Sequence, residues 1–165
     1  MSRSKTNDPL EELVPKTKAW NDGKGIDVRD WVSCEGDFQL AVGYSTVFWP
    51  EFFEIGKYVL TGPAPAGLIR DWETRYPNEF GRIEAVLNHF HIATLRRGDD
   101  DEASEERVLH IGNVLKQIYI AKLKMNFPDR EFEVVFDDTP GKDLMDYDLT
   151  FYQTRHERRK VFGFF

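Results

Sequence analysis

Histidines and carboxylates are the residues in this 165-residue chain whose types suggest chemistry. His89 and His91 form a His-x-His pair, and His110 follows further along. Imidazole is a common zinc ligand. Side chains two residues apart point about 200° apart on a helix, whereas on a strand they share one face. Apolar residues recur at helical spacing from Phe80 to about Leu95. We therefore expect the pair on a helix, where the two rings cannot hold one ion.

No second metal motif completes a site around these histidines. The chain has no His-Glu-x-x-His sequence, and its single cysteine excludes a cysteine-based zinc set. We expect a structural or surface role for the histidines. His91, which lies near an acidic loop, is the candidate if one of them is functional.

Five aspartates crowd a second segment near the carboxyl end, namely Asp137, Asp138, Asp143, Asp146 and Asp148. Oxygen ligands suit Mg²⁺ or Ca²⁺. The EF-hand pattern fails, because Thr139 and Gly141 stand where ligands belong. A solvated loop that protects strand ends from pairing explains the crowding without an ion. The alternative is a metal-assisted hydrolase that uses these carboxylates together with nearby histidines.

A third group of acidic residues places six carboxylates in eight positions: Asp99, Asp100, Asp101, Glu102, Glu105 and Glu106. Glu105 and Glu106 suit the positive end of a helix that begins after Ser104. The surplus at residues 99–102 has no such explanation. A docked cationic protein would relieve the repulsion, so we expect a basic protein partner.

The partner-binding surface predicted from these patterns combines acidic loops with one exposed aromatic ring. Trp72 is the candidate ring, because it lies among charged neighbours and aromatic residues are enriched in interfaces. The predicted partner-binding residues are Asp99, Asp100, Asp101, Glu102, Trp72, Asp137 and Asp138.

The sequence contains an incomplete phosphate-binding loop and an incomplete nucleophile elbow. Gly62 and Gly67 have the spacing of a phosphate-binding loop, but Leu68 stands where lysine belongs. Val47 replaces the second glycine that a nucleophile elbow needs after Ser45. Cys34 has Glu35 beside it, which disfavours a thiolate. We expect no cofactor and no catalytic residue.

Composition narrows the class of protein. The net charge is −7, which disfavours binding to the phosphates of a nucleic acid. Hydrophobic residues make up 41% of the chain, which is enough for a folded core. No apolar run approaches the ~20 residues that span a bilayer. The start of the chain lacks a signal peptide's apolar stretch, and the lone cysteine excludes an internal disulfide. We expect a cytoplasmic protein that binds neither membrane nor nucleic acid.

Local patterns predict the elements of one α+β fold. Residues 52–60 form a hairpin around Gly56-Lys57, and residues 131–136 and 148–153 alternate as half-buried strands. Residues 68–76, 80–95 and 104–127 have helical periodicity. Residues 37–49 fit either a strand or a helix capped by Asp37, and Pro50 at their end favours the helix.

These elements predict an antiparallel sheet of about four strands, with three or four helices packed mainly on one face. Residues 1–25 are rich in lysine, aspartate, proline and glycine. We expect them to form a flexible arm, followed by a single α+β domain over residues 26–165.

Three segments, Phe48–Leu60, Val86–Ile92 and Asp148–Gln153, resemble small bacterial proteins of uncharacterised function. In size and acidity the chain is also similar to immunity proteins, which neutralise toxins. That resemblance implies a non-enzymatic protein-binding module that inhibits a basic protein. The metal-assisted hydrolase is the alternative.

Overall fold

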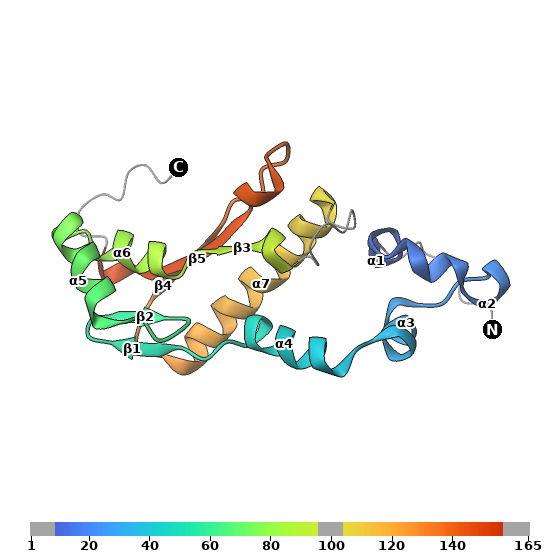
Figure 1. The fold of residues 1–165 in the computed structure, drawn as a ribbon, viewed down its shortest axis with the longest axis horizontal. Helices are drawn as coiled ribbons and strands as arrows, with labels where there is room; N and C mark the ends of the chain where they lie inside the picture. Colours follow the sequence, from blue (N-terminus) through green and yellow to red (C-terminus); the bar gives the residue numbers. More distant parts are fainter. Residues whose placement is uncertain (1–8, 96–103, 157–165) are drawn as a thin grey trace. The chain divides into compact units, whose positions relative to one another are not determined.

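The computed structural model describes residues 9–95 and 104–156, and it combines helices with short antiparallel strands, which confirms the α+β class (Figure 1). Internal contacts divide the chain into two units, Met1–Ser45 and Thr46–Phe165. The flexible arm over residues 1–25 and the single domain over residues 26–165 stay predictions. Every described helix is too short or too polar to cross a lipid bilayer.

The first unit is built from short helical segments. These are α1 (Pro9–Leu13), the 3₁₀ helix η1 (Pro15–Ala19), α2 (Trp20–Gly23), α3 (Val28–Glu35) and most of α4 (Phe38–Phe48). Asp37 caps α4, because its Oδ1 accepts hydrogen bonds from the main-chain nitrogens of Gln39 and Leu40. The helix expected over residues 37–49 is therefore confirmed.

The second unit begins with the predicted hairpin. Strands β1 (Phe53–Ile55) and β2 (Tyr58–Leu60) pair antiparallel, with Ile55 opposite Tyr58. Gly56 has a φ of 63°, and Lys57 is not among the residues with positive φ. That combination fits the type II′ turn predicted from glycine at the first central position.

Two helices follow the hairpin, α5 (Ala66–Arg75) and α6 (Phe80–Leu87). The helix predicted to continue to about Leu95 is wrong beyond Leu87. Asn88 ends it, and the chain extends into strand β3 (Phe90–His91) and the 3₁₀ helix η2 (Ile92–Leu95). The periodicity misled because Phe90 is apolar at a helical interval from Leu87 but belongs to a strand.

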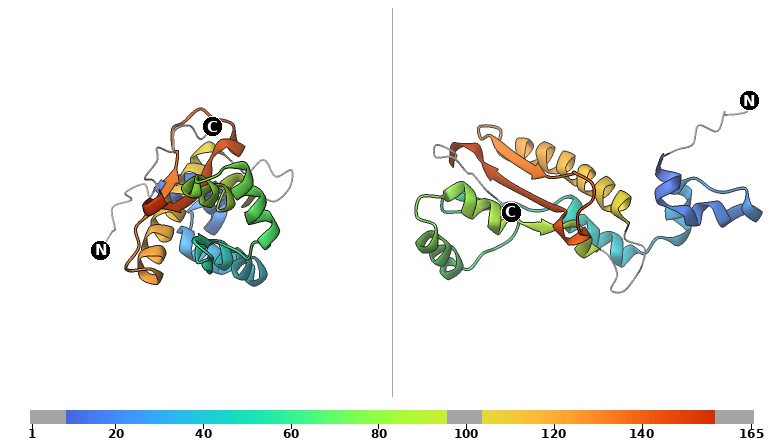
Figure 2. Two further views of the ribbon diagram at one scale, coloured as in Figure 1. Left: turned by 90° about the vertical axis from the view of Figure 1, so that its left-hand side faces the viewer. Right: turned by 90° about the horizontal axis from the view of Figure 1, so that it is seen from above.

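A three-stranded antiparallel sheet in the order β3-β5-β4 lies beside the long helix α7 (Glu105–Asn126) (Figures 1 and 2). The predicted strands are confirmed as β4 (Phe132–Phe136) and β5 (Asp148–Gln153), joined through the 3₁₀ helix η3 (Leu144–Asp146). A final 3₁₀ helix, η4 (Thr154–His156), follows β5. The buried core consists of Val59, Ile92, Val108, Leu115, Tyr119, Leu123, Val134, Phe136, Tyr147, Leu149 and Phe151.

The prediction of one four-stranded sheet is corrected by this topology. The hairpin β1-β2 is a separate two-stranded sheet, and the larger sheet gains its third strand from the unpredicted β3. A second hydrophobic cluster joins β2 to the two helices that follow it, through Tyr58, Leu60, Ile69 and Ile83. The helices therefore do not all cover one face of one sheet.

Side chains at α6 and its carboxyl end connect the two sheets, which do not pair with each other through their strands. The carboxylate of Glu84 accepts hydrogen bonds from the main-chain nitrogens of Val59 in β2 and Gln153 in β5, each 2.6 Å long. One turn later, the amide of Asn88 donates to the main-chain oxygens of Val59 and Phe151. Helix α6 thus satisfies the edge of β5 that the two-residue β3 leaves unpaired.

Candidate functional site

The candidate site lies where β3 meets the start of β5. In the antiparallel register, His91 is directly opposite Asp148, and Phe90 is opposite Leu149. Side chains of facing residues on an antiparallel pair stand close together on one face. The register therefore brings an imidazole and a carboxylate, 57 positions apart in the chain, into contact.

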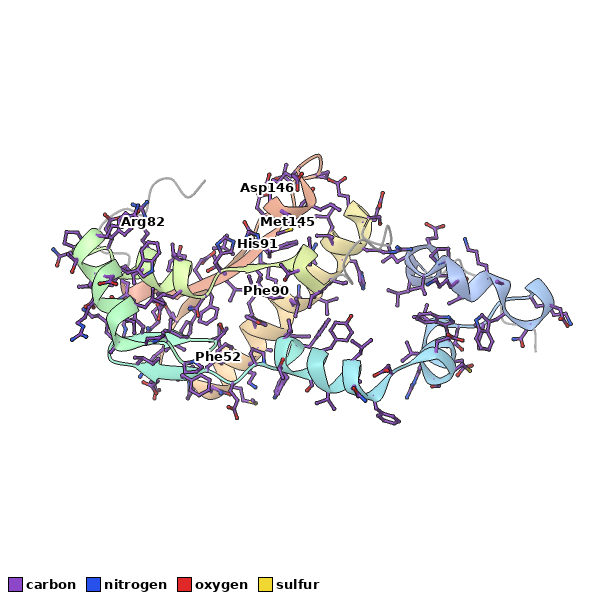
Figure 3. The ribbon with its side chains drawn as sticks, in the orientation of Figure 1. Phe52, Arg82, Phe90, His91, Met145 and Asp146 are labelled. Atoms are coloured by element: carbon purple, nitrogen blue, oxygen red, sulfur yellow. The ribbon has the colours of Figure 1, made fainter. Side chains whose placement is uncertain are left out.

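Strand alternation places both histidines on the same face. Leu149 is fully buried in the core that α7 covers, and Phe90 packs against that core. Neighbouring side chains on a strand alternate, so His91 and Asp148 belong to the opposite face. His89 directly precedes β3 and reaches the same face, with its Nε2 2.9 Å from Asp148 Oδ1. Figure 3 shows His91 and Phe90 on opposite sides of β3.

The three side chains converge on a single carboxylate oxygen. Asp148 Oδ1 lies 2.9 Å from His89 Nε2 and 2.5 Å from His91 Nδ1. The two imidazole rings lie 4.4 Å apart between centroids. One possible ligand atom from each of the three residues lies within 4.8 Å of the other two. Among the described residues, this is the group of side chains that is spaced closely enough to hold a metal ion. For comparison, two ligand atoms bound to one tetrahedral Zn²⁺ are about 3.3 Å apart.

Asp148 Oδ1 is buried but has no aligned hydrogen bond within the described part of the chain. The two imidazole nitrogens are close enough, yet neither contact has hydrogen-bond geometry. A buried polar atom without an aligned partner is costly, and a carboxylate oxygen more so. A cation between the three side chains would remove that cost.

The main chain orients the ring of His91. Its Nδ1 lies 2.7 Å from the main-chain oxygen of Met145 in η3. A carbonyl oxygen carries no proton, so Nδ1 is the donor in this hydrogen bond. The same nitrogen is the one that faces Asp148 Oδ1, so an ion would bind His91 through Nε2 while Nδ1 stays with Met145. Metal-binding histidines typically donate their second ring N–H to a carbonyl or carboxylate in this way.

Solvent reaches the cluster from the histidine side. The side chains of His91 and His89 are 41% and 28% exposed, whereas that of Asp148 is 12% exposed. Three protein ligands at a partly exposed position leave room for water as a further ligand, which is the pattern of catalytic rather than structural zinc sites.

The expectation that His89 and His91 cannot share an ion is wrong, because it assumed a helix across residues 80–95. Helix α6 ends at Leu87, His91 lies in strand β3, and His89 directly precedes that strand. The alternation of His89, Phe90, His91 and Ile92 is itself a strand pattern, and it is the signal that would have identified the pair.

The predicted partner-binding residues that the structure describes, Trp72, Asp137 and Asp138, are not members of this cluster. Residues 99–102 fall outside the described part of the chain. Trp72 lies on α5, half-buried and stacked on Tyr76 with ring centroids 5.5 Å apart. Arg75 flanks both rings, with its guanidinium carbon 5.8 Å from the centroid of Trp72.

Asp137 and Asp138 are exposed and directly follow β4. Asp137 pairs with Lys142 Nζ and accepts from the main-chain nitrogen of Thr139. The hydrogen bond from Lys142 contributes most to holding the pKa of Asp137 far below its usual value. Asp137 follows Phe136, which is opposite Leu149, but its carboxylate is held by Lys142 and is not part of the histidine cluster.

Comparison with protein-family models, curated proteins and solved structures found no match. We therefore infer function from the geometry of the chain's own residues.

Proposed function

We propose that the protein binds a divalent transition-metal ion through His89, His91 and Asp148. The observation that carries this proposal is the buried Asp148 Oδ1, which lies within 3 Å of two imidazole nitrogens without an aligned hydrogen bond. Two imidazoles and one carboxylate suit Zn²⁺, Co²⁺ or Ni²⁺ better than Mg²⁺ or Ca²⁺, which prefer oxygen ligands.

Three protein ligands leave a solvent-accessible coordination position for water on the ion, and this supports a metal-assisted hydrolase. A metal ion that keeps a bound water lowers the pKa of that water and generates hydroxide near neutral pH. This proposal keeps the reaction class of the alternative from the sequence and changes its ligands. Asp148 and the nearby histidines are retained from that alternative, whereas Asp137 and Asp138 are not among the proposed ligands.

Isothermal titration calorimetry tests the ion site. We expect one Zn²⁺ or Co²⁺ per chain, and far weaker heats with Mg²⁺ or Ca²⁺. His89→Ala, His91→Ala and Asp148→Asn should each abolish tight binding. His110→Ala is the matched control, because His110 is exposed on α7 and outside the cluster. Equal binding by the Asp148→Asn variant would contradict the proposal.

Hydrolysis is tested on the loaded protein with chromogenic carboxyl-ester and phosphate-ester probes. We expect turnover with Zn²⁺ or Co²⁺ that disappears in the Asp148→Asn variant and persists in the His110→Ala variant. Ion binding without turnover of any probe would support the ion site and contradict the hydrolase proposal.

A second candidate is the protein-binding function expected from the acidic surplus. Helix α4 favours it, because the helix carries no charged residue and exposes Phe38, Leu40 and Val42 by 91%, 59% and 68%. Apolar surface of this kind marks interaction sites. Affinity capture should retain a partner that the Leu40→Asp/Val42→Asp variant no longer retains. A partner that both proteins retain and that only added salt releases would instead be bound by an acidic surface.

A further inference from the structure

The loop of residues 137–147, which joins β4 to β5, is fastened to α7 by one carboxylate. Glu105 Oε1 accepts a hydrogen bond from the Tyr147 hydroxyl and a second, 2.6 Å long, from the main-chain nitrogen of Gly141. These two bonds, the tyrosine bond first, hold the pKa of Glu105 below its usual value. Glu105 is the first residue of α7, so one helix terminus holds both halves of the loop.

The same loop is fastened to the candidate ion site on its other side. The main-chain oxygen of Met145 lies 2.7 Å from His91 Nδ1, and the main-chain nitrogen of Ile92 donates to the oxygen of Tyr147 over 3.0 Å. Figure 3 shows Met145 on the side of β3 where His91 lies. The residue after Tyr147 is the ligand Asp148.

Tyr147 connects the two attachments. Its ring is fully buried, and its hydroxyl is 3.3 Å from the main-chain oxygen of Thr139 in addition to its bond with Glu105. The two bonds of Glu105 stabilise the docked loop, so loss of either bond favours movement of the loop away from α7. Such movement displaces Asp148 and the Met145 oxygen together.

We propose that Glu105 and Tyr147 are positioning residues for the ion, and that ion binding is coupled to docking of the loop of residues 137–147. This inference rests on the proposed ion site. Because coupling between two equilibria is reciprocal, an ion that is bound better by the docked loop must also favour docking by the same factor.

The test combines ion affinity with amide hydrogen exchange in the full chain. Tyr147→Phe removes the hydroxyl and keeps the buried ring, and Glu105→Ala removes the acceptor. Tyr119→Phe is the matched control, because Tyr119 is a buried tyrosine of α7 whose ring packs against Phe52 and Phe151. Zn²⁺ affinity is measured by competition with a chromogenic chelator, and circular dichroism identifies any variant that does not fold.

Zn²⁺ should slow exchange across residues 137–147 in the wild type, with the amides of Gly141 and Ile92 as reporters of the two attachments. The Tyr147→Phe and Glu105→Ala variants should bind Zn²⁺ about fivefold or more weakly. The Tyr119→Phe variant should match the wild type. If Tyr147→Phe does not fold, Glu105→Ala decides.

Two outcomes separate this inference from the proposal on which it rests. Failure of the wild type to bind Zn²⁺ would overturn both. Tight binding by the wild type, with unchanged affinity in the loop variants or no Zn²⁺-dependent protection of the loop, would overturn the coupling alone.

Discussion

Glu84 offers a direct test of how the two sheets are joined. Its side chain is fully buried. Oε1 accepts from Val59 N and from Gln153 Nε2, and Oε2 accepts from Gln153 N, with all three bonds 2.6 Å long. The substitution Glu84→Gln keeps the size of the side chain and one of its oxygens.

The expected loss of stability follows from this arrangement. The glutamine oxygen replaces Oε1 and keeps two bonds, but its NH₂ group then faces the main-chain nitrogen of Gln153. One hydrogen bond is lost and one buried donor is left unsatisfied, so the free energy of unfolding should fall by about 1–3 kcal/mol. Glu84→Ala removes all three bonds and leaves a cavity, and should cost about 3–5 kcal/mol.

The pH dependence has a definite sign. Burial is the main cause that raises the pKa of Glu84 above its usual value of 4.5. A carboxyl with a raised pKa in the folded state stabilises the protein fully at pH below 4.5, and this contribution is lost as the pH rises through the folded-state pKa. The cost of Glu84→Gln should therefore be largest in acid and smaller at neutral pH.

Urea unfolding followed by tryptophan fluorescence, at several pH values between 4 and 8, measures this cost. Glu79→Gln is the matched control, because Glu79 is exposed beside the same helix and pairs with Arg82. A Glu84→Gln variant as stable as the wild type at every pH would refute the role assigned to Glu84. A stability cost that grows with pH would mean that the three hydrogen-bond donors lower the pKa of Glu84 more than burial raises it.

Three further substitutions test packing and surface charge. Gly112→Ala should destabilise the protein by about 1–3 kcal/mol in thermal or urea unfolding, because the added Cβ overlaps the ring of Phe136. Gly67→Ala on α5 meets open space and should instead stabilise it, by up to about 1 kcal/mol. Asp137→Asn should leave the unfolding midpoint unchanged near neutral pH, because its pair with Lys142 is exposed; a clear drop in the midpoint would contradict this.

The elements that local sequence specifies were predicted. The hairpin around Gly56 follows from the backbone freedom of one glycine, and α7 follows from Ser104, whose side chain accepts from the main-chain nitrogen of Arg107. Strand β5 alternates between half-buried and buried residues along its whole length, and the apolar residues of its alternation, Leu149 and Phe151, are buried together with the polar Gln153. Each of these signals lies within a few residues of the element that it defines.

The site was missed because its geometry depends on pairing across the chain. Strand β3 has two residues, and only its register with Asp148 makes it a strand. Helical periodicity from Phe80 extended through it and separated the two histidines. Glu84 was missed for a related reason, since a glutamate on an amphipathic helix is ordinarily exposed, and its burial follows from contacts with β2 and β5.

X-ray absorption spectroscopy of the Zn²⁺-loaded protein tests the central claim most directly, because it identifies the atoms bound to the ion. We predict a shell of nitrogen and oxygen with the outer scattering of two imidazoles and no sulfur, and one imidazole fewer in the His91→Ala variant. A shell of oxygen alone, a sulfur ligand from the exposed Cys34, or a spectrum unchanged by His91→Ala would contradict the account.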